Sequence, residues 1–213
     1  MSLPARDLFA KMHFSEEQLN AIKQIYYKYF HEHMPDDKDY VGRATSVLFY
    51  KGAKWKAGEG YDRNHQVGGF VVPEAKEDPL WDHFKDIMPY MEPAAVITKL
   101  PAGKTMHPHV DRAWRPEAIY FPIEGCSDQC ISDYYDIPKA DTQNSQSKTE
   151  HPTPIYSYCI NTHAYLTNTH EWHGVRNESN MTRIAFGWNF KQSEMRSYAE
   201  CRDIMIKLGY VRE

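Results

Sequence analysis

The chain has 213 residues, of which 41% are hydrophobic and 25% charged, and this composition is that of an ordinary globular protein. The formal net charge is −4 and no block of basic residues occurs, so nucleic acid is not expected as a partner. No apolar run has the length of a signal peptide or a transmembrane helix, so we expect no membrane partner. The four cysteines form no C-x-x-C pair, which favours a reduced, cytoplasmic protein.

We expect a single domain of residues 1–213, whose first 92 residues form a helical and mixed part. Ser15 and Gln18 fit a capping box, and apolar residues at helical spacing follow, which predicts an amphipathic helix over residues 15–34. The β-branched and aromatic segments 44–50 and 68–72 predict strands. Asp78 as a cap and the helical spacing of the apolar residues after it predict a second helix over residues 79–91.

After residue 92 the pattern changes to short segments rich in β-branched and aromatic residues, separated by turn residues. This pattern is typical of an antiparallel sandwich or barrel, and we predict a mainly β fold with flanking helices, whose core is a jelly roll over residues 93–191. The polar stretch 139–154 predicts a long structureless loop over one end of the sheets, which could act as a lid. Residues 192–213 predict a closing helix that ends near Gly209. The expected core strands are "AAVITKL", "EAIYFPI", "PIYSYCI", "HAYLTNT" and "RIAFGWNF".

The stretch "PAGKTMHPHVDRAW" places His107, His109 and Asp111 at alternate positions where a strand ends. Residues two apart in a strand point to the same face, so these side chains could converge. An imidazole and a carboxylate in H-x-D spacing can bind one face of a metal ion, and a second histidine would complete a facial triad of the kind found in non-haem Fe(II) oxygenases. His173, which lies before a turn and the last core strand, is the best candidate for that histidine.

Arg183 follows His173 by ten residues and opens the last core strand. The guanidinium group binds a carboxylate through two parallel hydrogen bonds. A metal ligand and an arginine on adjoining strands could therefore bind a dicarboxylate, with one end on the metal and the other on Arg183.

The segments "LPAGKTMHPHVD" and "HGVRNESNMTR" resemble the 2-oxoglutarate/Fe(II)-dependent oxygenase superfamily over about residues 93–191. The longer segments "HVDRAWRPEAIYFPIEGCSDQ" and "TNTHEWHGVRNES" are similar to a group of small oxygenases of marine phages and bacteria, and to the core of the aspartyl/asparaginyl β-hydroxylases. The resemblance implies a double-stranded β-helix. It also implies hydroxylation of a C–H bond with O2, while 2-oxoglutarate is converted to succinate and CO2. An amino acid, a peptide side chain or a small metabolite could be the substrate.

Transferred to this chain, the resemblance implies that His109, Asp111 and His173 bind Fe(II). It implies that Arg183 binds the distal carboxylate of 2-oxoglutarate and that Tyr120 is a second hydrogen-bond donor to it. The family often has R-x-S at this place, whereas here Arg183 is followed by isoleucine and alanine. Another donor must then assist Arg183.

Two alternatives remain open. His107 and His109 form an H-x-H pair that half-matches a cupin, which would be a metalloenzyme without 2-oxoglutarate; Glu117, however, follows at the wrong spacing, so we expect His107 to have a structural role. The chain could also be a non-catalytic jelly-roll binding module. Arg112 and Arg115 could contact an acidic substrate or belong to a solvated face.

Overall fold

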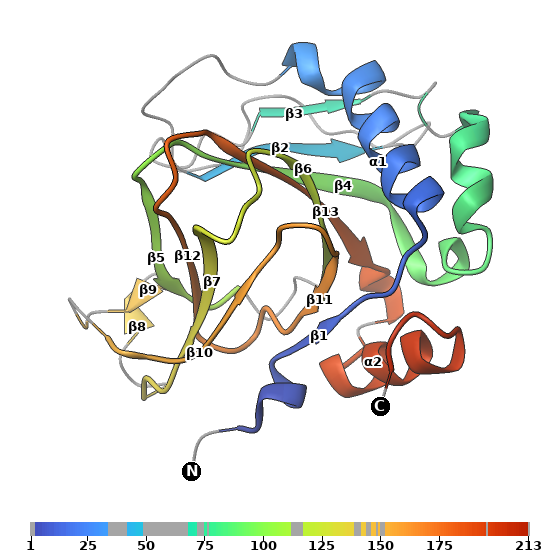
Figure 1. Ribbon diagram of the computed structural model, residues 1–213. Coiled ribbons are helices and arrows are strands. Elements are labelled where there is room, and N and C mark those ends of the chain that lie inside the picture. Colours follow the sequence, from blue (N-terminus) through green and yellow to red (C-terminus); the bar gives the residue numbers. More distant parts are fainter. Residues whose placement is uncertain are drawn as a thin grey trace.

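In the computed structural model, two curled β-sheets face each other and form a barrel that is open at its ends (Figure 1). The larger sheet has the strand order β1-β11-β6-β13-β4-β2-β3, and the smaller one β10-β7-β12-β5-β9-β8. All pairs are antiparallel except β2 with β3. The predicted mainly β, jelly-roll core is therefore confirmed. The structure describes residues 3–33, 42–48, 68–71, 75, 77–111, 117–138, 142–143, 146–147, 149, 152–194 and 196–212.

The strands and helices have the following bounds. The strands of the larger sheet are β1 (Phe9–Lys11), β2 (Gly42–Leu48), β3 (Gly68–Val71), β4 (Met91–Leu100), β6 (Ala118–Glu124), β11 (Tyr165–Thr167) and β13 (Arg183–Phe190). Those of the smaller sheet are β5 (Thr105–His109), β7 (Cys130–Tyr135), β8 (Thr142–Gln143), β9 (Gln146–Ser147), β10 (Pro154–Cys159) and β12 (His173–Asn177). The helices are α1 (Glu16–Tyr29) and α2 (Tyr198–Lys207), with 3-10 turns η1 (Ala5–Asp7), η2 (His31–His33), η4 (Pro79–Phe84), η5 (Met88–Tyr90) and η6 (Gln192–Glu194).

The helices cover the outer face of the larger sheet (Figure 1). Strand β13 shows how its two faces divide, because side chains alternate along a strand. Phe186 and Trp188 point outward into the main hydrophobic core, where they meet Phe30 after α1 and Trp81 of η4. The alternate residues, starting with Arg183, point into the barrel. The larger sheet thus separates a helix-covered hydrophobic core from the interior of the barrel.

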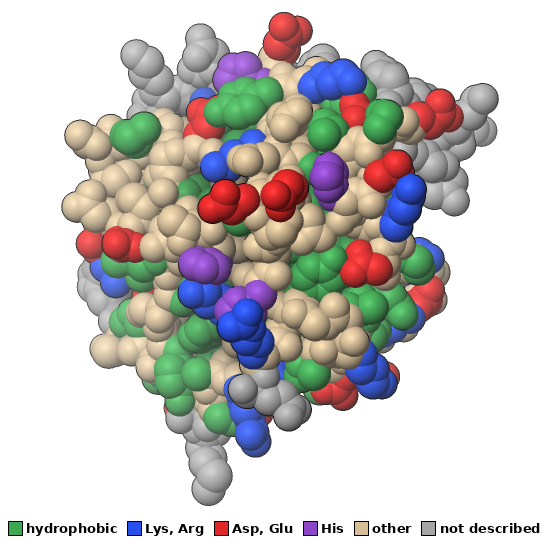
Figure 2. Space-filling view, turned by 45° about the vertical axis from the view of Figure 1, so that its right-hand side comes forward, with side chains coloured by type: hydrophobic (Ala, Val, Ile, Leu, Met, Phe, Trp, Pro, Cys, Tyr) green, Lys and Arg blue, Asp and Glu red, His purple; other side chains and the backbone are tan. Residues whose placement is uncertain are grey.

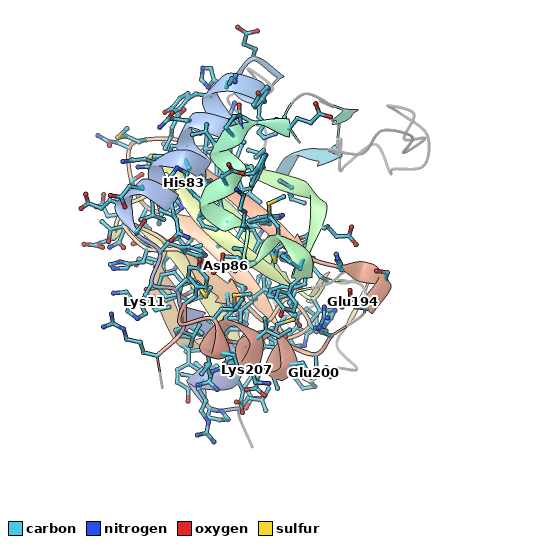
Figure 3. The ribbon with its side chains drawn as sticks, turned by 90° about the vertical axis from the view of Figure 1, so that its right-hand side faces the viewer. Lys11, His83, Asp86, Glu194, Glu200 and Lys207 are labelled. Atoms are coloured by element: carbon cyan, nitrogen blue, oxygen red, sulfur yellow. The ribbon has the colours of Figure 1, made fainter. Side chains whose placement is uncertain are left out.

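Charged side chains of both signs are intermixed with hydrophobic ones on the face seen in Figure 2. Figure 3 shows the helical side of the molecule, with six charged or titratable residues labelled. They are Lys11 on β1, His83 on η4, Asp86 in the turn after η4, Glu194 on η6, and Glu200 and Lys207 on α2. The four cysteines carry free thiols. Among the described residues, no helix is both long and apolar enough to cross a membrane.

Helix α1 begins as the sequence predicts. The Ser15 hydroxyl accepts a hydrogen bond from the Gln18 N–H, and the Gln18 side chain accepts one from the Ser15 N–H, which is the predicted capping box. The helix ends at Tyr29, before the predicted end at residue 34. Gly209, with φ +83°, lies just after α2 and ends that helix, as predicted.

Two local predictions are wrong. Residues 79–91 form the two short turns η4 and η5 and the start of β4 instead of one helix, since Pro89 provides no backbone N–H for a continuous helix. The stretch 139–154 is not wholly structureless, because it contains β8 and β9 and the first residue of β10. Strand β9 pairs with β5 at His109, which places this segment next to the predicted metal ligands.

Candidate metal centre

His109 and His173 face each other across a pair of antiparallel strands. His109 ends β5 and His173 begins β12; the two residues are register partners, and their ring centroids lie 4.3 Å apart. Asp111 follows β5 by two residues and is buried. One ligand atom from each of these three residues lies within 4.8 Å of those of the other two. The structure therefore brings the three predicted metal ligands together.

A β-bulge in β5 separates His107 from this cluster. Between the partners His173–His109 and Val175–Met106, the two residues His107 and Pro108 lie opposite the single residue Gly174. A bulge shifts the alternation of side chains by one residue. His107 is consequently exposed, whereas Met106 and His109 both line the interior. Pro108 suits this bulge because it has no N–H to donate to the ladder. Gly174 suits it because a Cβ at this position would lie 2.9 Å from the Met106 carbonyl oxygen.

Backbone carbonyls orient both histidine rings. His109 Nδ1 lies 2.8 Å from the His107 carbonyl oxygen, and His173 Nδ1 lies 2.9 Å from that of Glu171. A carbonyl oxygen only accepts hydrogen bonds, so each Nδ1 carries the proton and each Nε2 keeps a lone pair for a metal. Such hydrogen bonds fix the tautomer and direction of metal-binding histidines. Two imidazoles and a carboxylate in this arrangement suit a divalent transition metal and leave coordination positions open.

An interior pocket extends from the two histidines to Arg183. Its walls come from both sheets, and Arg183 is 3% exposed. Among the described residues, none accepts a hydrogen bond from the Arg183 Nε, and no carboxylate lies within 4.0 Å of the guanidinium. Buried charges in proteins are normally paired, so this guanidinium suits an anionic ligand.

Hydroxyl groups surround Arg183 in this pocket. Tyr120 lies on β6, opposite Gly187 of β13, and a Cβ at position 187 would approach the Tyr120 ring to 2.8 Å. Thr98 lies on β4 directly opposite Ala185, lines the same pocket, and donates to the Ala185 carbonyl oxygen over 3.3 Å. The serine that the R-x-S pattern would place at position 185 thus has a hydroxyl counterpart on the neighbouring strand.

Tyr158 adds a further hydroxyl to the pocket. It lies 2.9 Å from the Thr167 hydroxyl, and burial raises the pKa of Tyr158 to about 12, although hydrogen bonds from Thr167 and Ser132 and the charge of Arg183 oppose this shift. The phenol therefore stays protonated at neutral pH and keeps a proton for hydrogen bonding. Among the residues that line the pocket, Asp133 is paired with Arg176, so the Arg183 guanidinium and the neutral hydroxyls are the groups that suit a carboxylate.

The buried carboxylate of Glu117 is connected to Asp111 through the backbone of Thr169. Glu117, 1% exposed, accepts a hydrogen bond from the Thr169 N–H over 2.7 Å, and its other oxygen lies 3.1 Å from His170 Nδ1. The Thr169 carbonyl oxygen in turn accepts the Asp111 N–H over 2.9 Å. The hydrogen bond with Glu117 raises the pKa of His170 against the opposing effect of burial. The sequence suggested Glu117 only as a poorly spaced cupin ligand, and it gave no sign of this pair.

Comparison with solved structures identifies the fold. The chain shares its fold with SnoK. SnoK is described as a non-haem α-ketoglutarate-dependent carbocyclase from nogalamycin biosynthesis; the TM-score is 0.51 at 11% identity over 87% of this chain and 80% of SnoK. HygX from Streptomyces hygroscopicus, solved with nickel and 2-oxoglutarate, has a TM-score of 0.45 at 9% identity, over 87% of this chain and 83% of HygX. A Pseudomonas putida prolyl-4-hydroxylase has a TM-score of 0.44 at 14% identity, over 88% of this chain and 94% of the hydroxylase. No protein-family model and no curated protein sequence matches the chain.

The positions of the predicted site residues are thus as follows. His109, Asp111 and His173 converge, and Arg183 and Tyr120 line the pocket that starts at the two histidines. His107 does not join them. Arg112 and Arg115 lie outside the described residues, as does half of the predicted lid. The metal-binding role of the three ligands and the resemblance to phage enzymes or aspartyl/asparaginyl β-hydroxylases stay predictions.

Proposed function

We propose that the protein is an Fe(II)- and 2-oxoglutarate-dependent oxygenase. One observation carries this proposal: the two histidines of a two-histidine, one-carboxylate cluster line the same interior pocket as a buried guanidinium that has no carboxylate partner among the described residues. 2-Oxoglutarate has a keto-acid end that chelates a metal and a distal carboxylate that an arginine can bind. The pocket offers a binding group for each end.

The residues have distinct tasks in this proposal. His109, Asp111 and His173 hold the metal, with each imidazole directed by its carbonyl partner. Arg183 binds the distal carboxylate, assisted by the hydroxyls of Tyr120 and Thr98. The bound iron and 2-oxoglutarate supply, with O2, the oxidising chemistry that hydroxylates a C–H bond and yields succinate and CO2.

The substrate we propose is an amino acid, a peptide side chain or another small metabolite. SnoK shares the fold and is described as a carbocyclase, so the fold is compatible with more than one oxidative outcome. Hydroxylation is the simplest outcome for a site of this kind. The exposed His107 supports the oxygenase over a cupin that would use both histidines of the H-x-H pair.

Anaerobic titration tests the metal and cosubstrate together. We expect Fe(II) plus 2-oxoglutarate to give a visible charge-transfer band in the wild-type protein and in the His107→Ala control, but not in the His173→Ala variant. His107 is a suitable control because it lies two residues from a proposed ligand and is exposed. An empty binding module would give no band in any of the proteins.

Turnover provides the second test. We expect substrate-independent conversion of 2-oxoglutarate to succinate in air by the wild-type protein, and its loss when Asp111→Ala and His173→Ala are combined. Equal succinate output from the wild-type and the doubly substituted protein would contradict the proposal. A metalloenzyme of the cupin kind would bind Fe(II) but would lose nothing when Arg183 is replaced.

A further inference from the structure

Two segments that carry or precede proposed metal ligands meet near Glu117, which itself precedes β6. Asp111 lies after β5, and Thr169 and His170 form the turn between β11 and β12 that leads to His173. No strand ladder joins Asp111 to this turn. The hydrogen bond from the Asp111 N–H to the Thr169 carbonyl oxygen connects them instead.

Glu117 binds the same turn through the backbone N–H of Thr169, whereas Asp111 binds it through the Thr169 carbonyl oxygen. The Glu117 carboxylate accepts the Thr169 N–H over 2.7 Å and also lies 3.4 Å from the Thr169 hydroxyl. The Glu117 carbonyl oxygen accepts the Phe190 N–H over 2.9 Å, which attaches the same residue to the end of β13. The carboxylate is therefore held by the larger sheet while it holds the turn of the metal site.

His170 makes this burial of charge possible. Its Nδ1 lies 3.1 Å from the second Glu117 oxygen, and the imidazole is one-third exposed, so it compensates the buried carboxylate from the solvent side. Glu117 and His170 thus form an ion-pair contact at the point where Asp111 approaches the chain leading to His173.

We propose that Glu117 and His170 are positioning residues that set the distance between Asp111 and His173 and thereby the affinity for the metal. This inference rests on the proposed function only in that the three-residue cluster binds a metal. Neither residue belongs to the proposed ligand set, and neither lines the pocket around Arg183. Their effect is on metal binding, and the pocket for the distal carboxylate is left intact.

The test is an anaerobic Co(II) titration of the metal-free full-length chain, followed by the visible d–d absorption of the bound ion and by competition with a chelator. Substitution of groups that support metal ligands typically weakens metal binding about 10–100-fold. We expect such a loss for Glu117→Leu, a smaller loss for His170→Ala, and near wild-type affinity for Glu117→Gln, whose amide oxygen still accepts the Thr169 N–H.

Asp78→Asn is the matched control. Asp78 is a similarly buried carboxylate that pairs with a partly exposed cation, Lys28, and accepts a backbone N–H, from Leu80, but it lies on the helical side of the larger sheet. Urea unfolding of each variant shows how much stability it loses. Asp78→Asn should lose stability and keep its Co(II) affinity, since it does not support the metal cluster.

His170→Ala separates positioning from electrostatics. Removal of a neutral or cationic imidazole cannot by its charge weaken the binding of a divalent cation, so weaker binding indicates a change in ligand geometry. If Glu117→Leu does not fold, His170→Ala decides the question, because its partly exposed site tolerates alanine.

The outcomes are distinct. Wild-type Co(II) affinity in folded Glu117→Leu and His170→Ala proteins, or an equal loss in Asp78→Asn, would overturn the positioning role and leave the proposed function standing. A wild-type protein that binds no Co(II) would overturn the proposed function itself. Selective loss in the Glu117 and His170 variants supports the inference.

Discussion

Replacing Arg183 with methionine should have opposite effects on the stability of the ligand-free protein and on ligand binding. The guanidinium is 3% exposed and has no carboxylate partner within 4.0 Å among the described residues. Burial of a charge without an ionic partner costs stability, so an apolar side chain of similar length at this position should be neutral or stabilising. We therefore expect Arg183→Met to unfold at an equal or higher urea concentration than the wild-type protein when no ligand is added.

The same substitution, Arg183→Met, should weaken the binding of 2-oxoglutarate. Hydrogen bonds to charged groups contribute about 1.5–3 kcal/mol, so loss of the guanidinium should cost about 3 kcal/mol, or roughly a 100-fold rise in Kd. Saturation at about 100 times Kd stabilises a folded protein by about 2.7 kcal/mol, and at the same concentration this increment should fall to about 0.4 kcal/mol in the variant. Isothermal titration with Mn(II)-loaded protein measures the Kd, and urea unfolding with and without 2-oxoglutarate measures the increment.

Arg176→Met is the control for this experiment. Arg176 donates to Asp133, which is 1% exposed, over 2.8 Å, and its removal leaves that buried carboxylate without its cation. We expect this variant to lose about 1–3 kcal/mol of stability. If Arg183→Met were destabilised to the same extent and still bound 2-oxoglutarate with wild-type affinity, Arg183 would be a structural residue and the reasoning would be refuted.

Three further predictions concern the pocket and the helical side. Gly187→Ala should weaken 2-oxoglutarate binding in the same titration, because a Cβ 2.8 Å from the Tyr120 ring forces that ring into the pocket; unchanged affinity would show that the ring moves away from the ligand. Ser15→Ala should lower the free energy of unfolding by about 1 kcal/mol through loss of the helix cap, as measured in urea, and no change would mean that the capping box is dispensable. Burial alone would raise the pKa of Asp78, but hydrogen bonds, first of all from Lys28, lower it to about 2. Because this is below the unfolded value of about 3.9, the resulting stability is present above about pH 4 and is lost as the pH falls toward 2. Asp78→Asn should reduce this pH dependence of urea unfolding, and an identical slope in both proteins would contradict the assignment.

The jelly-roll core and the proposed ligands were predictable from the sequence because they depend on side-chain types. Segments such as residues 183–190 alternate between residues that face the helices and residues that face the interior. His109, Asp111, His173 and Arg183 were identifiable because few residue types bind metals or carboxylates. Their convergence needed only that β5, β12 and β13 lie in one barrel.

Other features depend on pairing and have no local signal. Strand β9 is a polar segment that is extended because β5 and β8 lie beside it. Residues 79–90 have apolar side chains at helical spacing, yet they form two 3-10 turns, and Pro89 excludes one continuous helix. Glu117 and His170 are separated by 53 positions, and only the tertiary structure reveals that they form a pair.

The bulge at His107 and Pro108 has a consequence for how such a site can change in evolution. Two histidines of identical chemistry differ in role because one extra residue of backbone lies between them and their partner strand. Residues two apart in a regular strand point to the same face, so a strand paired without the bulge would turn both histidines toward the interior. Backbone pairing, and not residue type, thus decides which histidine faces the proposed metal cluster, and sequence comparison of this region should weigh insertions and deletions as heavily as substitutions.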